Sequence, residues 1–254
     1  MITAINNKTY TGALSPGCQL CVDLKWSCVY LGLECTRDCF WCTKKHEDVA
    51  PFDMPTMKKI TSPQMYLRLI ESCGYLGTGF SGGEPLLKLP DIITYIRAIR
   101  REFGKTYYLW LYTNGDLLTE GNCAVLLDAG LDELRFDIAA ADYDLKALKT
   151  ACRIIGAVSV EIPAIPDDKN RVISLLPELA TAGVRYLNLH QLFATPYNEK
   201  KILARGYGLK NGAVTGSEET ALEIIDNIDA NKLNLSANYC SLKYKCERYR
   251  RIIS

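Results

Sequence analysis

The strongest constraint on the fold is an alternation of short apolar, β-rich segments with longer segments of helical periodicity. The strand candidates are residues 27–33, 75–80, 106–112, 133–138, 158–163 and 184–190. The helix candidates between them are residues 62–73, 89–103, 118–129, 144–155 and 170–182. This alternation is typical of βαβ units, in which helices connect parallel strands. The chain is therefore expected to be an α/β protein built on a parallel sheet.

The segment 89–103 shows the expected relation of helix to sheet. Its isoleucines Ile92, Ile93, Ile96 and Ile99 fall near one helical face, as in a helix that packs on a sheet. A chain of 254 residues is long enough for one large α/β domain with a substantial core. We expect an N-terminal segment, a core and a C-terminal extension that packs on the core, at residues 1–24, 25–192 and 193–254. The extension is expected to hold a helix at 217–230, a strand at 233–237 and a helix at 241–253.

Charge and composition exclude several classes of partner. The chain has 30 Lys and Arg against 29 Asp and Glu, a net charge of +1, which argues against nucleic acid or an anionic membrane. Residues 1–14 are polar and lack the apolar core of a signal peptide. No window approaches the length of apolar sequence that a membrane span needs. Eleven cysteines in such a chain indicate a reducing cytoplasm and metal ligands.

Three cysteines lie close together just after the first strand candidate. Cys35, Cys39 and Cys42 are separated by three and then two residues. A loop with this spacing can present three thiolates to one metal cluster. Because iron–sulfur clusters are normally held by four cysteines, one corner would be open to another ligand.

Other roles for these cysteines fit less well. A zinc ribbon needs two CxxC pairs about 15–20 residues apart, and no second pair follows at that distance. Disulfides need an oxidising compartment. Inert buried thiols are common, but three within eight residues are an unusual density.

The segment CTRDCFWC resembles the CxxxCxxC loop of the radical S-adenosylmethionine (SAM) enzymes, in which an aromatic residue such as Trp41 precedes the third cysteine. The later segments SGGEP, at 81–85, and YTNG, at 112–115, resemble two further motifs of the same superfamily. The resemblance implies a partial (β/α)₆ barrel with a short C-terminal extension. In parallel α/β folds ligands bind at the carboxyl ends of the strands, and each motif follows a strand candidate.

The resemblance also implies the chemistry. Cys35, Cys39 and Cys42 would ligate three irons of a [4Fe–4S] cluster, and SAM would chelate the fourth. One electron from the reduced cluster would cleave SAM to methionine and a 5′-deoxyadenosyl radical, which abstracts hydrogen from a substrate. The substrate would be a small molecule or a peptide, and the electron donor a protein such as flavodoxin or ferredoxin.

Two motifs supply candidate contacts with SAM. Gly82 and Gly83 would let the backbone approach the ligand, and Glu84 would face its amino group, as the resemblance implies. Thr113 and Asn114 could hydrogen-bond the ribose or the carboxylate of SAM. The alternative for both motifs is a purely structural turn.

Later strands carry further candidates. Arg135 and Asp137 share one face of a strand by the two-residue period. If Arg135 and Asp137 face the interior, each must be paired or bound to a ligand, and Asp137 is then the candidate for contact with ribose or substrate. If they face outward, they are ordinary surface residues. Leu189 and Leu192 would lie against adenine, as the resemblance implies. His190 is either a catalytic residue or a hydrogen-bonded core histidine.

Cys18 and Cys21 form a CxxC, and Cys240 lies near the C-terminus. Together with GCQLC, the tail segments LNLHQL, RGYGLK, TGSEETAL and ANYCSLKY resemble a little-characterised group of archaeal-type radical SAM proteins related to the pyruvate formate-lyase activating enzymes. That group carries cysteines at these three positions. They would form an auxiliary site for a second iron–sulfur cluster or zinc, or else remain isolated thiols.

Two rival functions stand beside a radical SAM enzyme of unidentified substrate. The first is a glycyl-radical enzyme activase, which the modest length and early cysteine loop would suit. The segment FDIAAADYD departs from the Asp-x-Lys pattern that such activases often show. The second rival is an iron–sulfur electron carrier that does not cleave SAM, against which the GGEP and YTNG motifs argue.

Overall fold

The computed structural model describes residues 2–5, 8–47 and 49–253, with side chains as far as residue 248. The chain forms two compact units, each built from several stretches of sequence. The first unit comprises Met1–Leu14, Arg37–Lys45 and Ser159–Arg250; the second comprises Ser15–Thr36, His46–Val158 and Arg251–Ser254. The boundary therefore falls within the cysteine loop, with Cys35 in the second unit and Cys39 and Cys42 in the first.

The second unit contains a sheet in the order β8-β7-β6-β3-β4-β5. Four of its strands run parallel: β3 (Trp26–Tyr30), β6 (Gly77–Ser81), β7 (Tyr108–Thr113) and β8 (Glu133–Phe136). The short strands β4 (Phe52–Asp53) and β5 (Lys58–Lys59) extend the sheet antiparallel at one edge. The helices of this unit are α1 (Pro16–Val22), α2 (Pro63–Cys73), α3 (Leu89–Phe103), α4 (Glu120–Ala129) and α5 (Lys146–Cys152).

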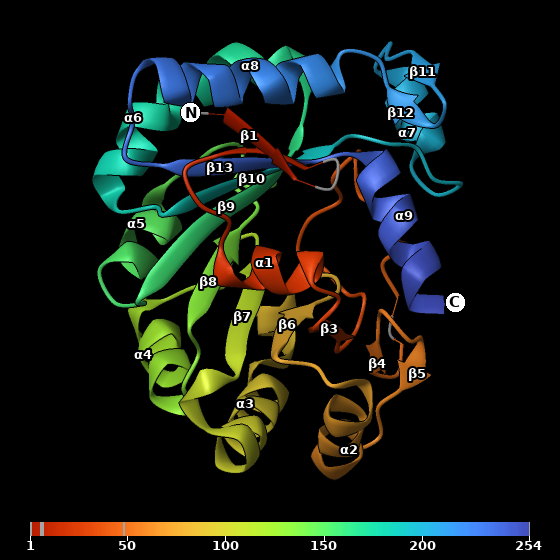
Figure 1. Cartoon of the computed structure of the whole chain (residues 1–254), viewed down its shortest axis with the longest axis vertical. Helices are drawn as coiled ribbons and strands as arrows, with labels where there is room; N and C mark the ends of the chain where they lie inside the picture. The colour runs from red at the N-terminus through yellow and green to blue at the C-terminus, as the bar shows by residue number, and fades with distance from the viewer. Residues whose placement is uncertain (1, 6–7, 48, 254) are drawn as a thin grey trace. The chain divides into compact units, whose positions relative to one another are not determined.

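The alternation of side chains along β6 shows that α1 and α2 lie on opposite faces of this sheet. Thr78 contacts the hydroxyl of Tyr66 in α2 at 2.6 Å. On the other face, a Cβ on Gly77 would lie 2.5 Å from Leu20 of α1. Figure 1 shows α1 across β6 and β7, which it contacts. Gly77 thus leaves room for α1, and Gly79 leaves room for the side chain of Trp110 in β7.

Local sequence explains where the helices of the second unit begin and end. In α2 the side chain of Ser62 caps the first turn by accepting from Met65 N, and Pro63 occupies the first helical position. Gly74 ends the helix with a φ of 62°, in the left-handed region that is unfavourable for residues with a side chain. The predicted isoleucine stripe of α3 is confirmed, because Ile92, Ile93, Ile96 and Ile99 are all buried.

The first unit contains strands in the order β1-β2-β13-β10-β9. The strands β9 (Ala157–Ala164), β10 (Tyr186–Gln191) and β13 (Ser236–Cys240) are parallel. The hairpin β1 (Ile2–Ile5) and β2 (Lys8–Thr11) pairs antiparallel with β13. The other elements are α6 (Lys169–Ala182), α7 (Glu199–Ala204), α8 (Ser217–Ala230), α9 (Leu242–Ile253) and the ribbon β11 (Leu209–Lys210) and β12 (Ala213–Val214).

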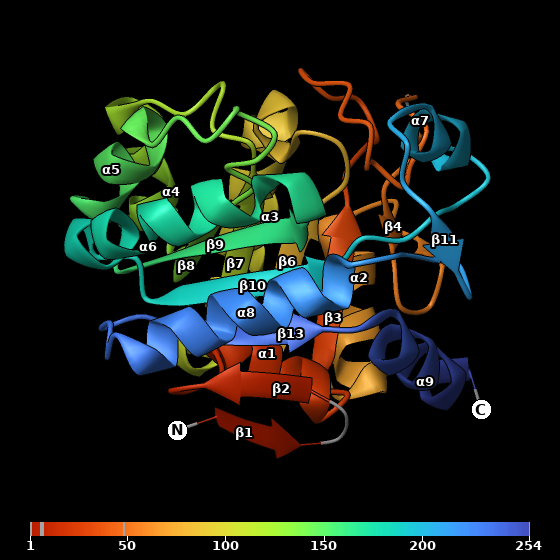
Figure 2. The ribbon, with the colours of Figure 1, turned by 90° about the horizontal axis from the view of Figure 1, so that it is seen from above.

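Helix α8 covers one face of the sheet in the first unit. It contacts β2, β10, β13 and α6, and Figure 2 shows it lying along β10 and β13. Leu189 of β10 is opposite Tyr239 of β13, so the two side chains share a face. Since α8 packs on β10 and β13, burial and then the Glu218 carboxylate of α8 raise the pKa of Tyr239, as expected on the face that α8 covers. His190 and Cys240, one residue further, point to the other face.

The six predicted core strands and the five helices between them are all present, with ends that shift by at most a few residues. Three elements were not predicted from the N-terminal sequence: β1, β2 and α1. The predicted strand at 233–237 was wrong in position, because β13 begins only at Ser236. Lys232 has a φ of 50°, so the chain still turns where the strand was expected to start. The division at residues 24 and 192 stays a prediction.

Candidate functional site

Three loops meet at the carboxyl ends of the parallel strands in the second unit. Residues 32–36 follow β3, residues 82–85 follow β6, and residues 113–116 end β7 and continue past it. Parallel neighbours bring these ends to the same edge of a sheet, where ligands of α/β proteins bind. The predicted GGEP and TNG motifs and the first cysteine of the CxxxCxxC loop therefore belong to one site.

Glu84 ties two of these loops together. Its Oε1 accepts hydrogen bonds from Thr113 Oγ1 at 2.9 Å and from Leu86 N at 3.1 Å. Its Oε2 accepts one from Asn114 N at 2.8 Å. Most of the acceptor positions of the carboxylate are thus occupied by protein donors. Through these bonds Glu84 positions the end of β7. Its predicted contact with the amino group of SAM stays a prediction.

The environment of Glu84 disfavours its charge. Only 2% of its surface is exposed, and burial raises the pKa of its carboxyl above the ordinary value of 4.5. The hydrogen bonds from Asn114, Leu86 and Thr113 oppose this rise, and the nearby Asp116 adds to it. The hydrogen bonds therefore hold Glu84 in place, although burying its carboxylate away from water is unfavourable.

The raised pKa of Glu84 predicts a pH-dependent contribution to stability. An acid with a higher pKa in the folded than in the unfolded protein stabilises the fold at low pH, and this contribution is lost as the pH rises through the folded pKa. We expect the free energy of unfolding of the wild type minus that of Glu84→Gln to fall between pH 4.5 and neutrality. Urea unfolding at a series of pH values measures this difference. A difference that stays constant or rises with pH would contradict the assignment.

Gly82 and Gly83 allow the loop after β6 to lie directly on the loop after β3. Gly83 N donates to Gly32 O at 3.1 Å, and Glu84 N donates to Glu34 O at 2.7 Å. A Cβ on Gly82 would lie 2.1 Å from Gly32 O, and one on Gly83 would lie 1.9 Å from Glu34 O. Gly82 also has a φ of 131°, a region that favours glycine. In the structure the two glycines thus make room for protein backbone.

Asn114 anchors the start of the cysteine loop. Its Nδ2 donates to Thr36 Oγ1 at 2.8 Å and lies 3.8 Å from the Sγ of Cys35. Thr36 Oγ1 in turn donates to Asp116 Oδ2 at 2.8 Å. Through these contacts the thiol of Cys35 has a defined place beside the motif that ends β7.

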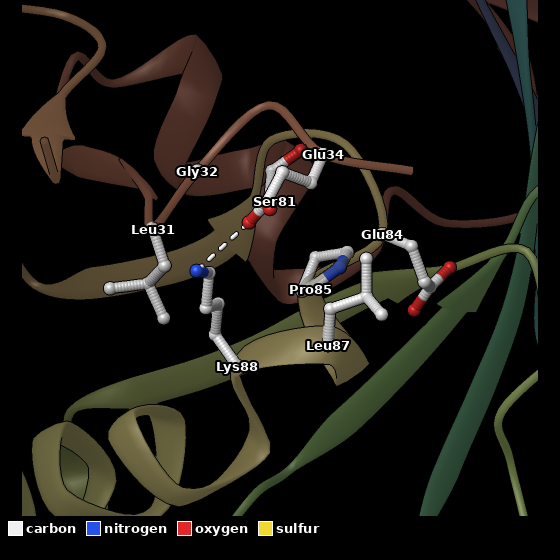
Figure 3. Close-up of a pocket in the computed structure, with 8 residues that line it drawn as sticks. All are labelled: Leu31, Gly32, Glu34, Ser81, Glu84, Pro85, Leu87 and Lys88. Atoms are coloured by element: carbon white, nitrogen blue, oxygen red, sulfur yellow. Dashed lines mark ion pairs between the residues drawn. The ribbon is translucent and has the colours of Figure 1, made fainter. Parts of the chain in front are cut away.

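The loops after β3 and β6 also line a small pocket, as Figure 3 shows. Its lining residues are Leu31, Gly32, Glu34, Ser81, Glu84, Pro85, Leu87 and Lys88. The ammonium of Lys88 lies 2.8 Å from the carboxylate of Glu34. In Figure 3 the Glu84 carboxylate points away from this ion pair. The pocket is therefore a neighbour of the Glu84 network, with a charge pair of its own.

The other two cysteines of the loop lie in the first unit, where residues of the C-terminal part hold them. Cys42 N donates to Cys39 O at 3.1 Å, which closes a turn. The buried Asn198 donates from Nδ2 to the carbonyl of Trp41 at 3.1 Å. Phe40 stacks on Tyr207 with ring centroids 5.9 Å apart. Lys201 pairs with Asp38 at 2.5 Å.

The end of β8 holds Arg135 and Asp137 in different ways. Arg135 and Glu133 are buried partners, with Nε and Oε1 3.0 Å apart, and Arg135 also donates to Ser15 at 2.9 Å. Arg135 was predicted to need a partner if it faces the interior, and Glu133 is that partner. Asp137 lies half-buried just past the strand, where its Oδ1 accepts from Ala140 N at 3.1 Å. A contact of Asp137 with ribose or substrate stays a prediction.

The three residues predicted at the end of β10, Leu189, His190 and Leu192, have different surroundings. His190 Nε2 lies 2.8 Å from the Glu161 carboxylate, and burial together with Lys245 lowers the pKa of His190. Leu189 is fully buried on the face under α8, and its predicted contact with adenine stays a prediction. Leu192 is also buried, and its N donates to Ser217 Oγ at 2.8 Å.

The predicted auxiliary cysteines fall in both units. Cys18 and Cys21 lie one turn apart on α1 in the second unit, and Cys240 ends β13 in the first. Cys18 is buried near Arg135, whose Nη1 lies 3.9 Å from its Sγ. Among the residues that the structure describes, no three or more His, Cys, Asp or Glu side chains form a ready metal-binding group. Both ligand sets, for the cluster and for the auxiliary site, therefore stay predictions.

The sequence reasoning missed the residues that support the site from a distance. Asn198 and Lys8 are buried and Glu161 is half-buried, and the partners of all three lie far away in the chain. The one available signal was Glu161, the single charge inside the mostly apolar strand 157–164. A buried strand tolerates such a charge only when it is paired.

Comparison with known proteins agrees with this geometry. The model of the Radical SAM superfamily matches residues 29–161, which is half of the chain. The chain therefore belongs to the radical SAM superfamily, a family of enzymes that use a [4Fe–4S] cluster and S-adenosylmethionine. No helix in the described part of the chain is both long and apolar enough to cross a membrane.

One curated relative, from Methanocaldococcus jannaschii, carries the provisional name glycyl-radical enzyme activating enzyme. It is 30% identical over 244 residues, which cover 89% of this chain and 63% of the relative. The chain thus spans less than two thirds of that protein. The identity supports the predicted relation to the pyruvate formate-lyase activating enzymes.

Two solved structures show the same fold at low identity. Streptococcus suis SuiB bound to its precursor peptide SuiA is 15% identical, with a TM-score of 0.62 over 85% of this chain and 48% of SuiB. Coproporphyrinogen III oxidase from Escherichia coli is 12% identical, with a TM-score of 0.53 over 82% of this chain and 52% of the oxidase. The predicted fold class, the partial barrel of radical SAM proteins, is confirmed.

Proposed function

We propose that this chain is a radical SAM enzyme in which Cys35, Cys39 and Cys42 hold the [4Fe–4S] cluster. When bound, the cluster supplies the electron that cleaves SAM to methionine and a 5′-deoxyadenosyl radical, which abstracts hydrogen from a small molecule or peptide. The observation that carries the proposal is the link from Glu84 through Asn114 to Cys35. It joins three motifs of the family at one edge of the sheet.

The residues of the chain fit this cofactor in several respects. Three thiols with a spacing of three and two residues suit a cluster with one open corner. Asn114 Nδ2 lies within 3.8 Å of Cys35 Sγ, where an amide N–H can stabilise a thiolate. Gly82 and Gly83 let the loop after β6 pack directly on the loop that carries Cys35. Trp41 stands between Cys39 and Cys42 in sequence, and Asn198 holds its backbone carbonyl.

The proposed activity is tested by SAM cleavage. The cluster is reconstituted anaerobically, dithionite and SAM are added, and 5′-deoxyadenosine is measured by chromatography. We expect 5′-deoxyadenosine to accumulate in proportion to the iron bound. A protein that carries about four irons per chain and yet makes no 5′-deoxyadenosine would refute the proposal. The electron-carrier alternative would then remain.

A second candidate is activation of a glycyl-radical enzyme, which the name of the Methanocaldococcus jannaschii relative favours. The target would then be a glycine of a partner protein. The two candidates differ in where the radical is found after the reaction. An activase produces a persistent protein-centred glycyl radical signal on its partner in electron paramagnetic resonance, whereas an enzyme of small-molecule substrates does not. The physiological electron donor in either case is proposed to be flavodoxin or ferredoxin.

A further inference from the structure

The sheet of the first unit has a polar face opposite α8. Its strands alternate between buried apolar residues under α8 and polar residues on the other face. The polar residues come from four strands, and a lysine of α9 joins them. We call this set the polar layer: Lys8, Glu161, Asn188, His190, Asn238, Cys240 and Lys245. Such a row of polar side chains on strands that are otherwise apolar calls for a physical reason.

Hydrogen bonds connect the members of the polar layer. Asn188 Nδ2 donates to Glu161 Oε2 at 2.9 Å, and Asn238 Nδ2 donates to Asn188 Oδ1. His190 Nε2 lies 2.8 Å from Glu161 Oε1. Lys8 Nζ lies 2.7 Å from Cys240 Sγ. Both oxygens of Glu161 are therefore in contact with polar side chains of the neighbouring strand.

Positive charge exceeds negative charge around the polar layer. Lys8 is only 1% exposed and Arg248 of α9 is 6% exposed. Burial lowers the pKa of Lys245, and Lys8 lowers it further. Glu161 is the one carboxylate of the polar layer, against the three cations Lys8, Lys245 and Arg248. Lys8 and Arg248 are buried and Lys245 is half-buried, and cations in such excess are costly unless an anion joins them.

Arg248 offers hydrogen-bond donors that the described part of the protein does not use. Its Nε and Nη2 are buried and have no hydrogen-bond partner among the described residues. Its Cζ lies 5.8 Å from the ring centroid of Tyr244, and Lys8 Nζ lies 4.9 Å from the same centroid. Both cations thus stand beside one ring. The Nε and Nη2 pair is the part of a guanidinium that can bind a carboxylate or phosphate through two parallel hydrogen bonds.

We propose that the polar layer and Arg248 bind an oxyanion, the carboxylate or phosphate group of a small-molecule substrate. This inference rests on the proposed function, since it names the substrate class of that enzyme. Lys8, Lys245 and Arg248 neutralise the anion, and the Asn188 and Asn238 amides and Tyr244 line the site. The side chains of His190 and Glu161 are 27% and 13% exposed, so the layer is open to solvent beside them.

Binding of an oxyanion can be measured without turnover. Isothermal titration calorimetry of the reconstituted holoenzyme uses inorganic phosphate in one arm and succinate in the other, with chloride at equal ionic strength as the blank. We expect saturable binding of at least one oxyanion by the wild type. Arg248→Gln and Lys245→Met should each weaken it by about tenfold or more, because a charge-assisted hydrogen bond is lost. Lys243→Met, an exposed lysine on the same helix, is the matched control and should bind as the wild type does.

Thermal unfolding separates a binding role of Arg248 from a structural one. Without oxyanion, Arg248→Gln should be at least as stable as the wild type, because the substitution removes a buried charge that lacks hydrogen-bond partners. A marked loss of stability without oxyanion would assign Arg248 to the scaffold and overturn its role in binding. Oxyanion should raise the melting temperature of the wild type and of Lys243→Met, but not of Arg248→Gln.

The remaining outcomes are also decisive. Wild type that binds neither phosphate nor succinate above the chloride blank would overturn the inference. Displacement of the bound oxyanion by SAM would assign these cations to the carboxylate of the cofactor and overturn it as well. A loaded protein that makes 5′-deoxyadenosine but binds no oxyanion leaves the proposed function intact. A protein that binds the oxyanion but does not cleave SAM refutes only the proposed function.

Discussion

Replacement of Cys35, Cys39 and Cys42 together by alanine is expected to abolish both the bound iron and the cleavage of SAM. Three thiolates are the protein's whole proposed contribution to the cluster, so their removal leaves no ligand set at that loop. The variant should nevertheless fold, because all three side chains are half-buried rather than part of the core. Iron content, the ultraviolet–visible spectrum and 5′-deoxyadenosine after anaerobic reconstitution measure the effect.

The matched control for this variant is Cys73→Ser. Cys73 is also half-buried, but it ends α2, away from the strand ends that carry the motifs. It should keep the iron and the activity of the wild type. SAM cleavage that persists in the triple variant would refute the ligand assignment. Iron that remains near four per chain without SAM cleavage would instead indicate a second cluster, for which Cys18, Cys21 and Cys240 are the proposed ligands.

Gly83→Ala is expected to damage both stability and the site. The new Cβ would lie 1.9 Å from Glu34 O and 2.6 Å from Leu33 O, both backbone atoms that cannot rotate away. The loop after β6 would have to withdraw from the loop after β3, which breaks the hydrogen bond from Glu84 N to Glu34 O. We expect a loss of about 3 kcal/mol in the free energy of unfolding. Urea unfolding measures this loss, and SAM cleavage by the surviving folded protein measures the effect on the site.

Gly156→Ala is the matched control for that substitution. No atom lies within 4 Å of the position that its Cβ would take, and its φ is not in the left-handed region. Its free energy of unfolding should stay within about 0.5 kcal/mol of the wild-type value. Equal stability of the two variants would show that the loops do not pack as closely as the structure indicates.

Most of the core fold could be predicted because its signals are local. The stripe of isoleucines in α3 and the turn residues around α2 act within a few residues of one another, so the sequence shows them directly. The N-terminal hairpin gave no such signal, and α1 offered only the capping Ser15 and Pro16 at its start. The strands of the hairpin have four residues each and α1 has seven, and elements this short depend on tertiary packing rather than on their own propensity.

The candidate site was predictable in its motifs but not in its internal bonding. The position of each motif just after a strand was enough to bring Glu84, Thr113 and Asn114 together. The sequence could not show that Glu84 would accept hydrogen bonds from its neighbours, because that depends on a close approach of separate loops. The pairing of His190 with Glu161 is of the same kind, since it joins residues 29 positions apart on neighbouring strands.

The aromatic and amide contacts of Phe40 and Trp41 bear on how short a working fragment of this protein could be. Their partners Tyr207 and Asn198 lie well beyond residue 161, where the match to the superfamily ends. A fragment trimmed to the recognisable motif region would keep every cysteine of the loop but lose the scaffolding of its second half. For this chain, the match to the superfamily marks out a smaller piece than the one that can hold the loop in shape.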